Sequence, residues 1–115
     1  MVLVAVDDLL FSSKIRASAK QAGVELTFAR SRDEILEQAR STKPALVIFD
    51  LNSTRLRPME AIAALKADPE LAGISTLGFV SHVDTETIAR ARRAGVDEVL
   101  ARSAFVERLG EILLR

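Results

Sequence analysis

The sequence predicts an α/β fold in which helices cover both faces of a five-stranded parallel sheet. Three observations carry this prediction. Short apolar runs alternate with helical patterns along the whole chain. One of these runs, residues 45–49, has the continuous apolar character of a strand that is buried on both faces. Finally, acidic residues end two of the runs, and the carboxyl ends of strands are where open α/β sheets bind ligands.

Composition limits the class of protein. The chain has 115 residues, which suits a single domain over 1–115, and 49% of them are apolar, enough for a core. Because 16 basic and 16 acidic residues balance, we expect no direct binding of nucleic acid. There is no Cys and the single His is His82, which excludes thiolate and multi-histidine metal sites. No apolar run is long enough to span a bilayer and the N-terminus lacks a basic signal region, so we expect a cytoplasmic domain that does not enter a membrane.

The first two strand–helix units come before residue 43. Residues 2–6 form an apolar strand, and from Leu10 apolar residues recur at helical spacing until Gly23, which suits a left-handed helix cap. Residues 24–28 alternate apolar and polar, as a half-covered strand does. Residues 31–34, with the sequence Ser-Arg-Asp-Glu, then form a capping box that begins the second helix.

The third unit carries the central strand. Lys43-Pro44 breaks the chain before it, and Asp50 ends its apolar run. After a polar stretch, Pro58 suits the first turn of the third helix, and Asp68-Pro69 ends that helix. Residues 74–80 predict the fourth strand.

The last two helices flank the fifth strand. Asp84 is the expected N-cap of the fourth helix, and Gly95 ends it. Residues 96–101 predict the fifth strand. Ser103 is then expected to cap a single last helix whose apolar side chains share one face.

This alternation and right-handed crossovers predict the flavodoxin-like (βα)5 three-layer sandwich, with strand order 2-1-3-4-5. That order places the ends of strands one and three side by side, so Asp7, Asp8 and Asp50 are expected to meet at one edge of the sheet. Each pair of carboxylates there is unfavourable by roughly 1 to 4 kcal/mol. A hard divalent cation such as Mg²⁺, which prefers oxygen ligands, would relieve this repulsion.

A carboxylate beside such a cation can act as a nucleophile and form an aspartyl-phosphate. We predict that Asp50 has this role. Ser81 and Arg102, at the ends of strands four and five, are placed to bind the other oxygens of the transferred phosphoryl group.

Along nearly its whole length the sequence resembles a receiver domain of the bacterial two-component response regulators. The residues that carry the resemblance are Asp7-Asp8, Asp50, Ser81 and the basic Arg102. The resemblance implies that the acidic pair, Asp50 and the backbone carbonyl of Asn52 hold Mg²⁺. It also implies that Asp50 accepts a phosphoryl group from a histidine kinase or phosphotransfer protein. A surface on the fourth helix, fifth strand and fifth helix would then bind an output partner or domain, so that the chain is a signalling domain and not an enzyme.

The sequence departs from the family pattern at four places. Arg102-Ser103 replaces the family's Lys-Pro, so that the usual cis-proline turn cannot form there. Residues 53–57 replace its Met-Pro and Gly-containing loop, and Val99 stands where a switch Tyr or Phe is usual. His82 is bulky beside the path of a phosphodonor. These departures support a second hypothesis, a receiver-like interaction module that no longer switches by phosphorylation.

Each singled-out residue also has a plain structural alternative. Asp50 suits a turn or helix cap, either residue of the pair Asp7-Asp8 suits the N-cap of the first helix, and Ser81 suits a strand-end turn. Arg102 suits a surface charge or a pair with Asp50 in the absence of metal. His82 suits a loop.

Two further alternatives concern a surface and another family. Arg90, Arg92 and Arg93 fit either a solvated helix face or a docking surface. Residues 50–54 share part of the Asp-x-Asp-x-Thr motif of haloacid-dehalogenase-type phosphatases, but that motif belongs on the first strand of a larger domain. The sequence leaves open the kinase, the output, the oligomeric state and whether the chain is part of a longer protein.

Overall fold

The computed structural model describes residues 1–81 and 84–115. The expectation that His82 lies in a loop concerns a residue outside these ranges. The strands, in chain order, are β1 (Val2–Ala5), β2 (Leu26–Phe28), β3 (Leu46–Asp50), β4 (Ser75–Val80) and β5 (Glu98–Ala101). The helices are α1 (Leu9–Ala22), α2 (Arg32–Thr42), α3 (Pro58–Ala67), α4 (Thr85–Ala94), α5 (Arg102–Glu107) and α6 (Leu109–Leu113). All strand pairs are parallel and the order is β2-β1-β3-β4-β5, which confirms the predicted topology.

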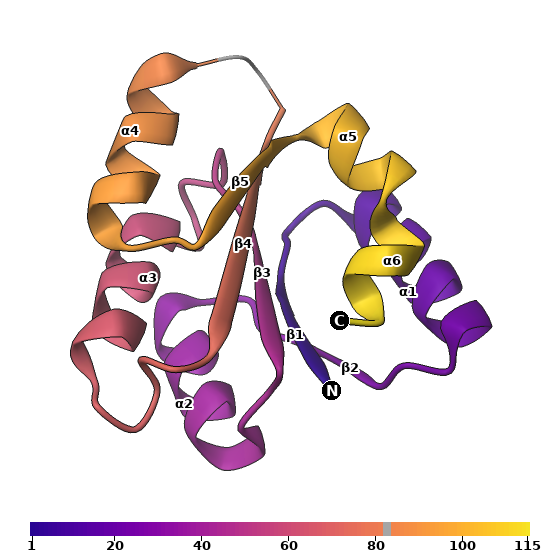
Figure 1. The fold of residues 1–115 in the computed structure, drawn as a ribbon, viewed down its shortest axis with the longest axis horizontal. Coiled ribbons are helices and arrows are strands. Elements are labelled where there is room, and N and C mark those ends of the chain that lie inside the picture. The colour runs from indigo at the N-terminus through magenta and orange to yellow at the C-terminus, as the bar shows by residue number, and fades with distance from the viewer. Residues whose placement is uncertain (82–83) are drawn as a thin grey trace.

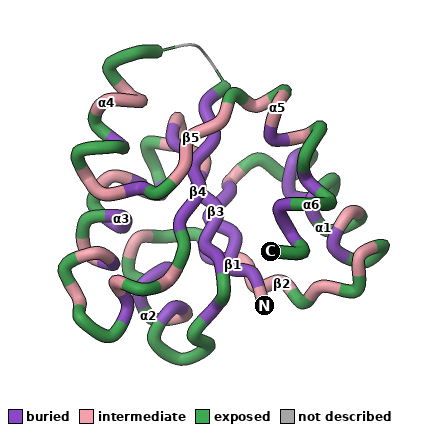
Figure 2. The backbone as a smooth tube through the Cα atoms, viewed as in Figure 1, coloured by how far each residue is buried: buried purple, intermediate pink, exposed green. Residues whose placement is uncertain are grey.

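Helices cover both faces of the sheet. In Figure 1, α2, α3 and α4 lie on one side of the strands, and α1, α5 and α6 lie on the other. Alternate residues of the central strands supply the two cores. Leu3, Val47 and Phe49 face the α2–α4 side, whereas Val4 and Ile48 face the α1, α5 and α6 side. The central strands are accordingly buried along almost their whole length (Figure 2).

The helix ends follow the local sequence signals. Gly23 and Gly95 both adopt the left-handed conformation, with φ of 72° and 109°, and their amides bond back to the last turn of α1 and α4. Ser31 Oγ accepts a hydrogen bond from the Glu34 amide at 3.1 Å. Asp84 caps α4 by accepting from the Glu86 and Thr87 amides. Pro58 begins α3, so the predicted starts of three helices are confirmed.

The C-terminal segment differs from the prediction. The chain forms two short helices, because the regular α5 ends at Glu107 and Arg108 adopts a φ of −100° before α6 begins. Ser103 is not the N-cap. Helix α5 begins directly after β5 at Arg102, with Ala101 in the cap position and no side-chain cap bond. The prediction for Ser103 was wrong because a hydroxyl residue at a helix start is only a local preference, and β5 leads directly into a helix that begins two residues earlier than a Ser103 cap would place it.

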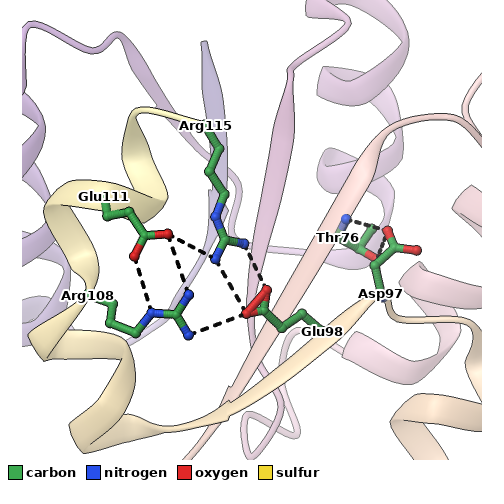
Figure 3. A network of polar contacts seen from close by, with 6 residues as sticks. All are labelled: Thr76, Asp97, Glu98, Arg108, Glu111 and Arg115. Atoms are coloured by element: carbon green, nitrogen blue, oxygen red, sulfur yellow. Dashed lines mark hydrogen bonds and ion pairs between the residues drawn. The ribbon is translucent and has the colours of Figure 1, made fainter.

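Polar side chains tie the elements together at the sheet edge where the strands begin. Figure 3 shows Glu98 of β5 between Arg108 and Arg115, with Glu111 bridging the same two arginines. These pairs are largely exposed, and such pairs contribute little stability individually.

Asp97 forms a tighter set of contacts at the same edge. Its Oδ2 accepts hydrogen bonds from the Thr76 amide at 2.8 Å, from Thr76 Oγ1 at 3.0 Å and from Lys66 Nζ at 3.0 Å. Lys66 also donates to the carbonyls of Ala72 and Ile74. Asp97 therefore connects the start of β5 to the start of β4 and, through Lys66, to α3.

Across the two described ranges, no helix combines the length and the apolar character that crossing a bilayer requires.

Candidate functional site

The predicted site residues lie at one edge of the sheet. Ala5 of β1 pairs with Phe49 of β3, so Asp50, the last residue of β3, lies at the same edge as Asp7, which comes two residues after β1. Val80 of β4 pairs with Ala101 of β5, which places Ser81 and Arg102 side by side beyond the next two strands. Parallel pairing from β1 to β5 thus gathers residues that are nearly a hundred positions apart in the sequence.

Asp8 has two roles. Its Oδ1 accepts a hydrogen bond from the Phe11 amide at 3.0 Å, which makes it the N-cap of α1, and its Oδ2 lies 3.4 Å from Arg102 Nη2. The Phe11 hydrogen bond, with a further contribution from Arg102, holds the pKa of the Asp8 carboxyl below its usual range. The alternative that one residue of the acidic pair caps the first helix is therefore confirmed for Asp8, whose side chain also contacts Arg102.

Asp7 lies beside Asp8 and pairs with a different cation. Its Oδ1 is 3.6 Å from Arg55 Nη1, which comes from the loop between β3 and α3. Arg55 is largely exposed, so the pair is weak.

Asp50 is the half-buried carboxylate of the group. Burial raises its pKa above the usual range, and repulsion from Asp8 and Asp7 acts in the same direction. A hydrogen bond from the Asn52 amide to Oδ1 at 3.0 Å and the charge of Arg102 act in the opposite direction, but they are outweighed. Asp50 thus accepts a turn-forming hydrogen bond from the Asn52 amide, and its charge is also repelled by the carboxylates of Asp7 and Asp8.

Arg102 lies among these groups. Its Nη1 donates to Ser81 Oγ at 3.3 Å, its Nη2 contacts Asp8, and its guanidinium lies over the ring of Phe11 with Cζ 4.1 Å from the centroid. The ion pair of Arg102 is therefore with Asp8, and not with Asp50 as the sequence alternative proposed. Ser81, which strand pairing places beside Arg102, accepts this hydrogen bond.

Three features of the site were not predicted. Asn52 was chosen for its backbone carbonyl, but its side-chain Oδ1 accepts a hydrogen bond from the Ser81 amide at 2.6 Å and joins the ends of β3 and β4. Leu56, inside a stretch that reads as polar, is fully buried. Phe11 is one of the apolar residues at helical spacing after Leu10, and its ring also lies beneath the Arg102 guanidinium. The burial of Leu56 could have been predicted, because it is a lone large apolar residue in a polar loop. Nothing in the sequence indicated that Asn52 contacts Ser81 or that Phe11 contacts Arg102.

The side chains do not form a ready-made metal cage. Within 1–81 and 84–115, no group of three His, Cys, Asp or Glu side chains is arranged so that it could hold a metal ion. Asp8 is turned to Arg102 and Asp7 to Arg55. The chemistry of the donors nevertheless suits Mg²⁺, because carboxylate oxygens are its preferred protein ligands and the site brings Asp7, Asp8 and Asp50 to one edge of the sheet.

Comparisons with known proteins agree with the fold. No family model matches the chain. The polar-differentiation response regulator DivK of Brucella ovis is 25% identical over 112 residues, which cover 97% of this chain and 91% of DivK. A response regulator from Hahella chejuensis superposes with a TM-score of 0.87 at 20% identity, over 98% of this chain and 91% of that one.

A second solved structure contains a metal. The receiver domain of the sensor histidine kinase PA1611 from Pseudomonas aeruginosa PAO1 was solved with a magnesium ion coordinated in its active-site cleft. It superposes with a TM-score of 0.85 at 17% identity, over 99% of this chain and 93% of that one.

The fold and the site define a doubly wound (βα)5 domain with acidic residues after its first strand and at the end of its third, and a hydroxyl and a basic residue after its fourth and fifth. These comparisons support a receiver domain of the response-regulator type, because the chain is similar in sequence to DivK over nearly its whole length and has the fold of the solved receiver domains. Such domains signal and are not enzymes in the ordinary sense.

The electrostatics of Asp50 give a first prediction. Asp50→Asn should make the metal-free protein more stable by about 1 kcal/mol, or about 4 °C in Tm, because it removes one charge from a group of like charges and keeps the Oδ1 acceptor. Because the folded-state pKa is raised, the cost of ionising Asp50 is fully present above that pKa and disappears as the pH falls below the unfolded value. Melting curves in EDTA at neutral and acidic pH measure this. An equal or lower Tm for the variant at neutral pH would show that the carboxylates do not interact.

Proposed function

We propose that the chain is a phosphoacceptor receiver domain in which Asp50 takes a phosphoryl group from a histidine kinase or a phosphotransfer protein. The observation that carries this proposal is the position of Asp50. It is a half-buried carboxylate at the sheet edge, within electrostatic range of Asp7 and Asp8, and Ser81 and Arg102 follow the next two strands.

The geometry suggests which atom of Asp50 reacts. Oδ1 is held by the Asn52 amide, and among the described residues no hydrogen bond reaches Oδ2. We assign Oδ2 as the nucleophile. The Oδ2–P bond forms while the P–N bond of the phosphohistidine donor breaks, and the leaving imidazole nitrogen keeps the bonding electron pair. The Ser81 hydroxyl and the Arg102 guanidinium are placed to donate hydrogen bonds to the equatorial oxygens of the phosphoryl group.

Magnesium is the cofactor that we propose for this site. Asp7 or Asp8, Asp50 and the carbonyl of Asn52 would hold it, and it would offset the charge that develops on the transferred group.

We further propose that phosphorylation changes the surface formed by α4, β5 and α5, where an output partner binds. Arg90, Arg92 and Arg93 of α4 are all exposed there, which fits both a solvated face and a docking surface. Val99 of β5 is only partly buried and packs against the core on the α4 side. The rotamer switch of an aromatic side chain is absent at this position, so coupling would pass through Ser81 and Arg102.

Phosphorylation is tested with small-molecule donors. The protein is incubated with Mg²⁺ and acetyl phosphate and its intact mass is recorded, and amide spectra are recorded with and without beryllofluoride. We expect one added phosphoryl group on the wild type and spectral changes around Asp50, Ser81 and Arg102. Asp50→Asn should lose the modification completely, whereas Asp33→Asn, at an exposed position on α2, should keep it.

The second candidate is a receiver-like interaction module that does not switch by phosphorylation. It is favoured by the absence of a ready-made metal cage among the described residues and by the contact of Asp8 with Arg102. An unmodified wild type, spectra unchanged by beryllofluoride, and partner binding equal for wild type and Asp50→Asn would support this candidate over the first.

A further inference from the structure

Arg102 is held at the site by three groups from two other elements. Asp8 and Phe11 come from the start of α1, and Ser81 follows β4. The side chain remains 38% exposed, so it can leave without disturbing the core. A guanidinium that stacks on an aromatic ring and forms a charged hydrogen bond is more strongly fixed than one with either contact alone.

The ring beneath the guanidinium cannot move easily. Phe11 is 4% exposed, and its centroid lies 4.9 Å from that of Phe79 and 5.8 Å from that of Phe105. Phe79 and Phe105 stack on each other with centroids 4.8 Å apart. We call these three side chains the phenylalanine cluster. It fixes the ring face on which Arg102 rests.

The position of Arg102 matters because Asp8 has only two carboxylate oxygens. Oδ1 caps α1 and Oδ2 contacts the guanidinium, so a second cation at Oδ2 would compete with Arg102 for the same oxygen. The charge of Arg102 also reaches Asp50, where it opposes the effect of the other two carboxylates. Arg102 thus already supplies part of the neutralisation that a metal would provide.

We infer that Arg102 is the resident cation of this acidic edge, that Phe11 positions it, and that a divalent cation binds Asp8 only by displacing the guanidinium. This inference rests on the metal site of the proposed function. It adds an order of events: when metal takes Asp8, Arg102 is released from its carboxylate partner while it stays near Ser81, where a phosphoryl oxygen can become its new acceptor.

The test measures metal affinity directly. Arg102→Gln should bind Mn²⁺ about three- to tenfold more tightly than wild type in a calorimetric titration, because a competing ion pair and a stacking contact are removed. Arg16→Gln is the matched control. Arg16 stacks on Phe28, with Cζ 4.3 Å from the centroid, but is not paired with Asp8. It should leave the affinity for Mn²⁺ close to that of wild type.

The role of Phe11 is tested by a double-variant comparison. Phe11→Leu should increase Mn²⁺ affinity in the wild-type background, because Arg102 loses the surface on which it rests, and should have no such effect in Arg102→Gln. A merely structural role of Phe11 would change metal affinity equally in both backgrounds. Arg102→Gln alone, at a partly exposed position, keeps the test independent of whether Phe11→Leu folds.

Thermal melting adds a readout that needs no phosphorylation. In EDTA, Arg102→Gln should melt below wild type, and Mg²⁺ should raise its Tm more than it raises that of wild type. Equal or weaker Mn²⁺ affinity for Arg102→Gln, with normal binding by wild type, would overturn the inference and leave the proposed function intact. No binding of Mn²⁺ by any variant would overturn both.

Discussion

Replacing Gly78 by alanine is expected to lower the free energy of unfolding by about 2 kcal/mol. Gly78 lies in β4, opposite Phe49 of β3. A methyl group at this position would lie 2.6 Å from Leu51 Cδ1 and 2.7 Å from Leu51 Cγ, so the Leu51 side chain must shift. Leu51 is only 4% exposed, so there is little space into which it can move. Urea unfolding of the two proteins measures the loss.

The same substitution should also impair the site. Leu51 stands between Asp50 and Asn52, and its amide donates to the Phe79 carbonyl at 3.0 Å, so a shift of Leu51 would also move Asp50 and Asn52. We expect slower modification of Asp50 by acetyl phosphate in Gly78→Ala. Trimming the clashing side chain in Gly78→Ala/Leu51→Ala should recover part of the stability relative to the sum of the two single variants. Full stability in Gly78→Ala alone would show that Leu51 does not pack on this glycine.

Asp97→Ala is expected to cost about 2 to 3 kcal/mol at the opposite edge of the sheet. The substitution removes the acceptor of the Thr76 amide, and Thr76 is only 2% exposed, so its N–H group would be left without a partner in a buried place. It also removes the carboxylate that binds Lys66. Asp97→Asn, which keeps one side-chain oxygen and loses the charge, should have an intermediate effect.

The pH dependence of this effect has a definite sign. Desolvation raises the pKa of Asp97, but hydrogen bonds from Thr76 and Lys66 together outweigh it and hold the pKa below its usual range. The carboxylate therefore contributes stability that is present above its unfolded pKa and is lost as the pH falls through the lower folded value. Unfolding curves at neutral pH and in acid should show the gap between wild type and Asp97→Ala closing in acid. A constant gap would contradict the assignment.

The two variants separate stability from function. Both weaken the fold, but Asp97 belongs to the sheet edge where the strands begin, while Gly78 supports the residue next to Asp50. At a temperature where both proteins remain folded, Asp97→Ala should accept a phosphoryl group at the wild-type rate. A slowed reaction in both would mean that loss of stability alone explains the effect.

The topology was predictable because each of its signals is local and repeated. Continuous apolar runs, glycine caps such as Gly23 and Gly95, and a proline at the start of α3 all report on their own neighbourhood. The strand boundaries were less accurate: β2 begins at Leu26 and β5 at Glu98, two residues inside the predicted ranges. Pairing with the neighbouring strand decides where a strand begins, and the chain pattern alone does not record it.

The positions of the site residues followed from topology, but their partners did not. Strand order alone brings Asp50, Ser81 and Arg102 to one edge. Whether Arg102 pairs with Asp8 or Asp50 depends on side-chain directions that are set by α5 beginning at Arg102 itself. For Asn52 the sequence suggested a role of the backbone carbonyl and not of the side chain. The hydrogen bond from the Ser81 amide to the side-chain oxygen of Asn52 joins the ends of two strands, and the sequence does not show such a contact.

The phenylalanine cluster has a spectroscopic consequence. The chain contains no Trp and no Tyr, and three of its five Phe residues belong to this cluster. Near-ultraviolet circular dichroism of the unlabelled protein therefore arises from phenylalanine alone, and one ring of the cluster carries the guanidinium. The protein holds a built-in chromophore beneath its acidic edge, whose signal can follow the departure of Arg102 without any attached dye.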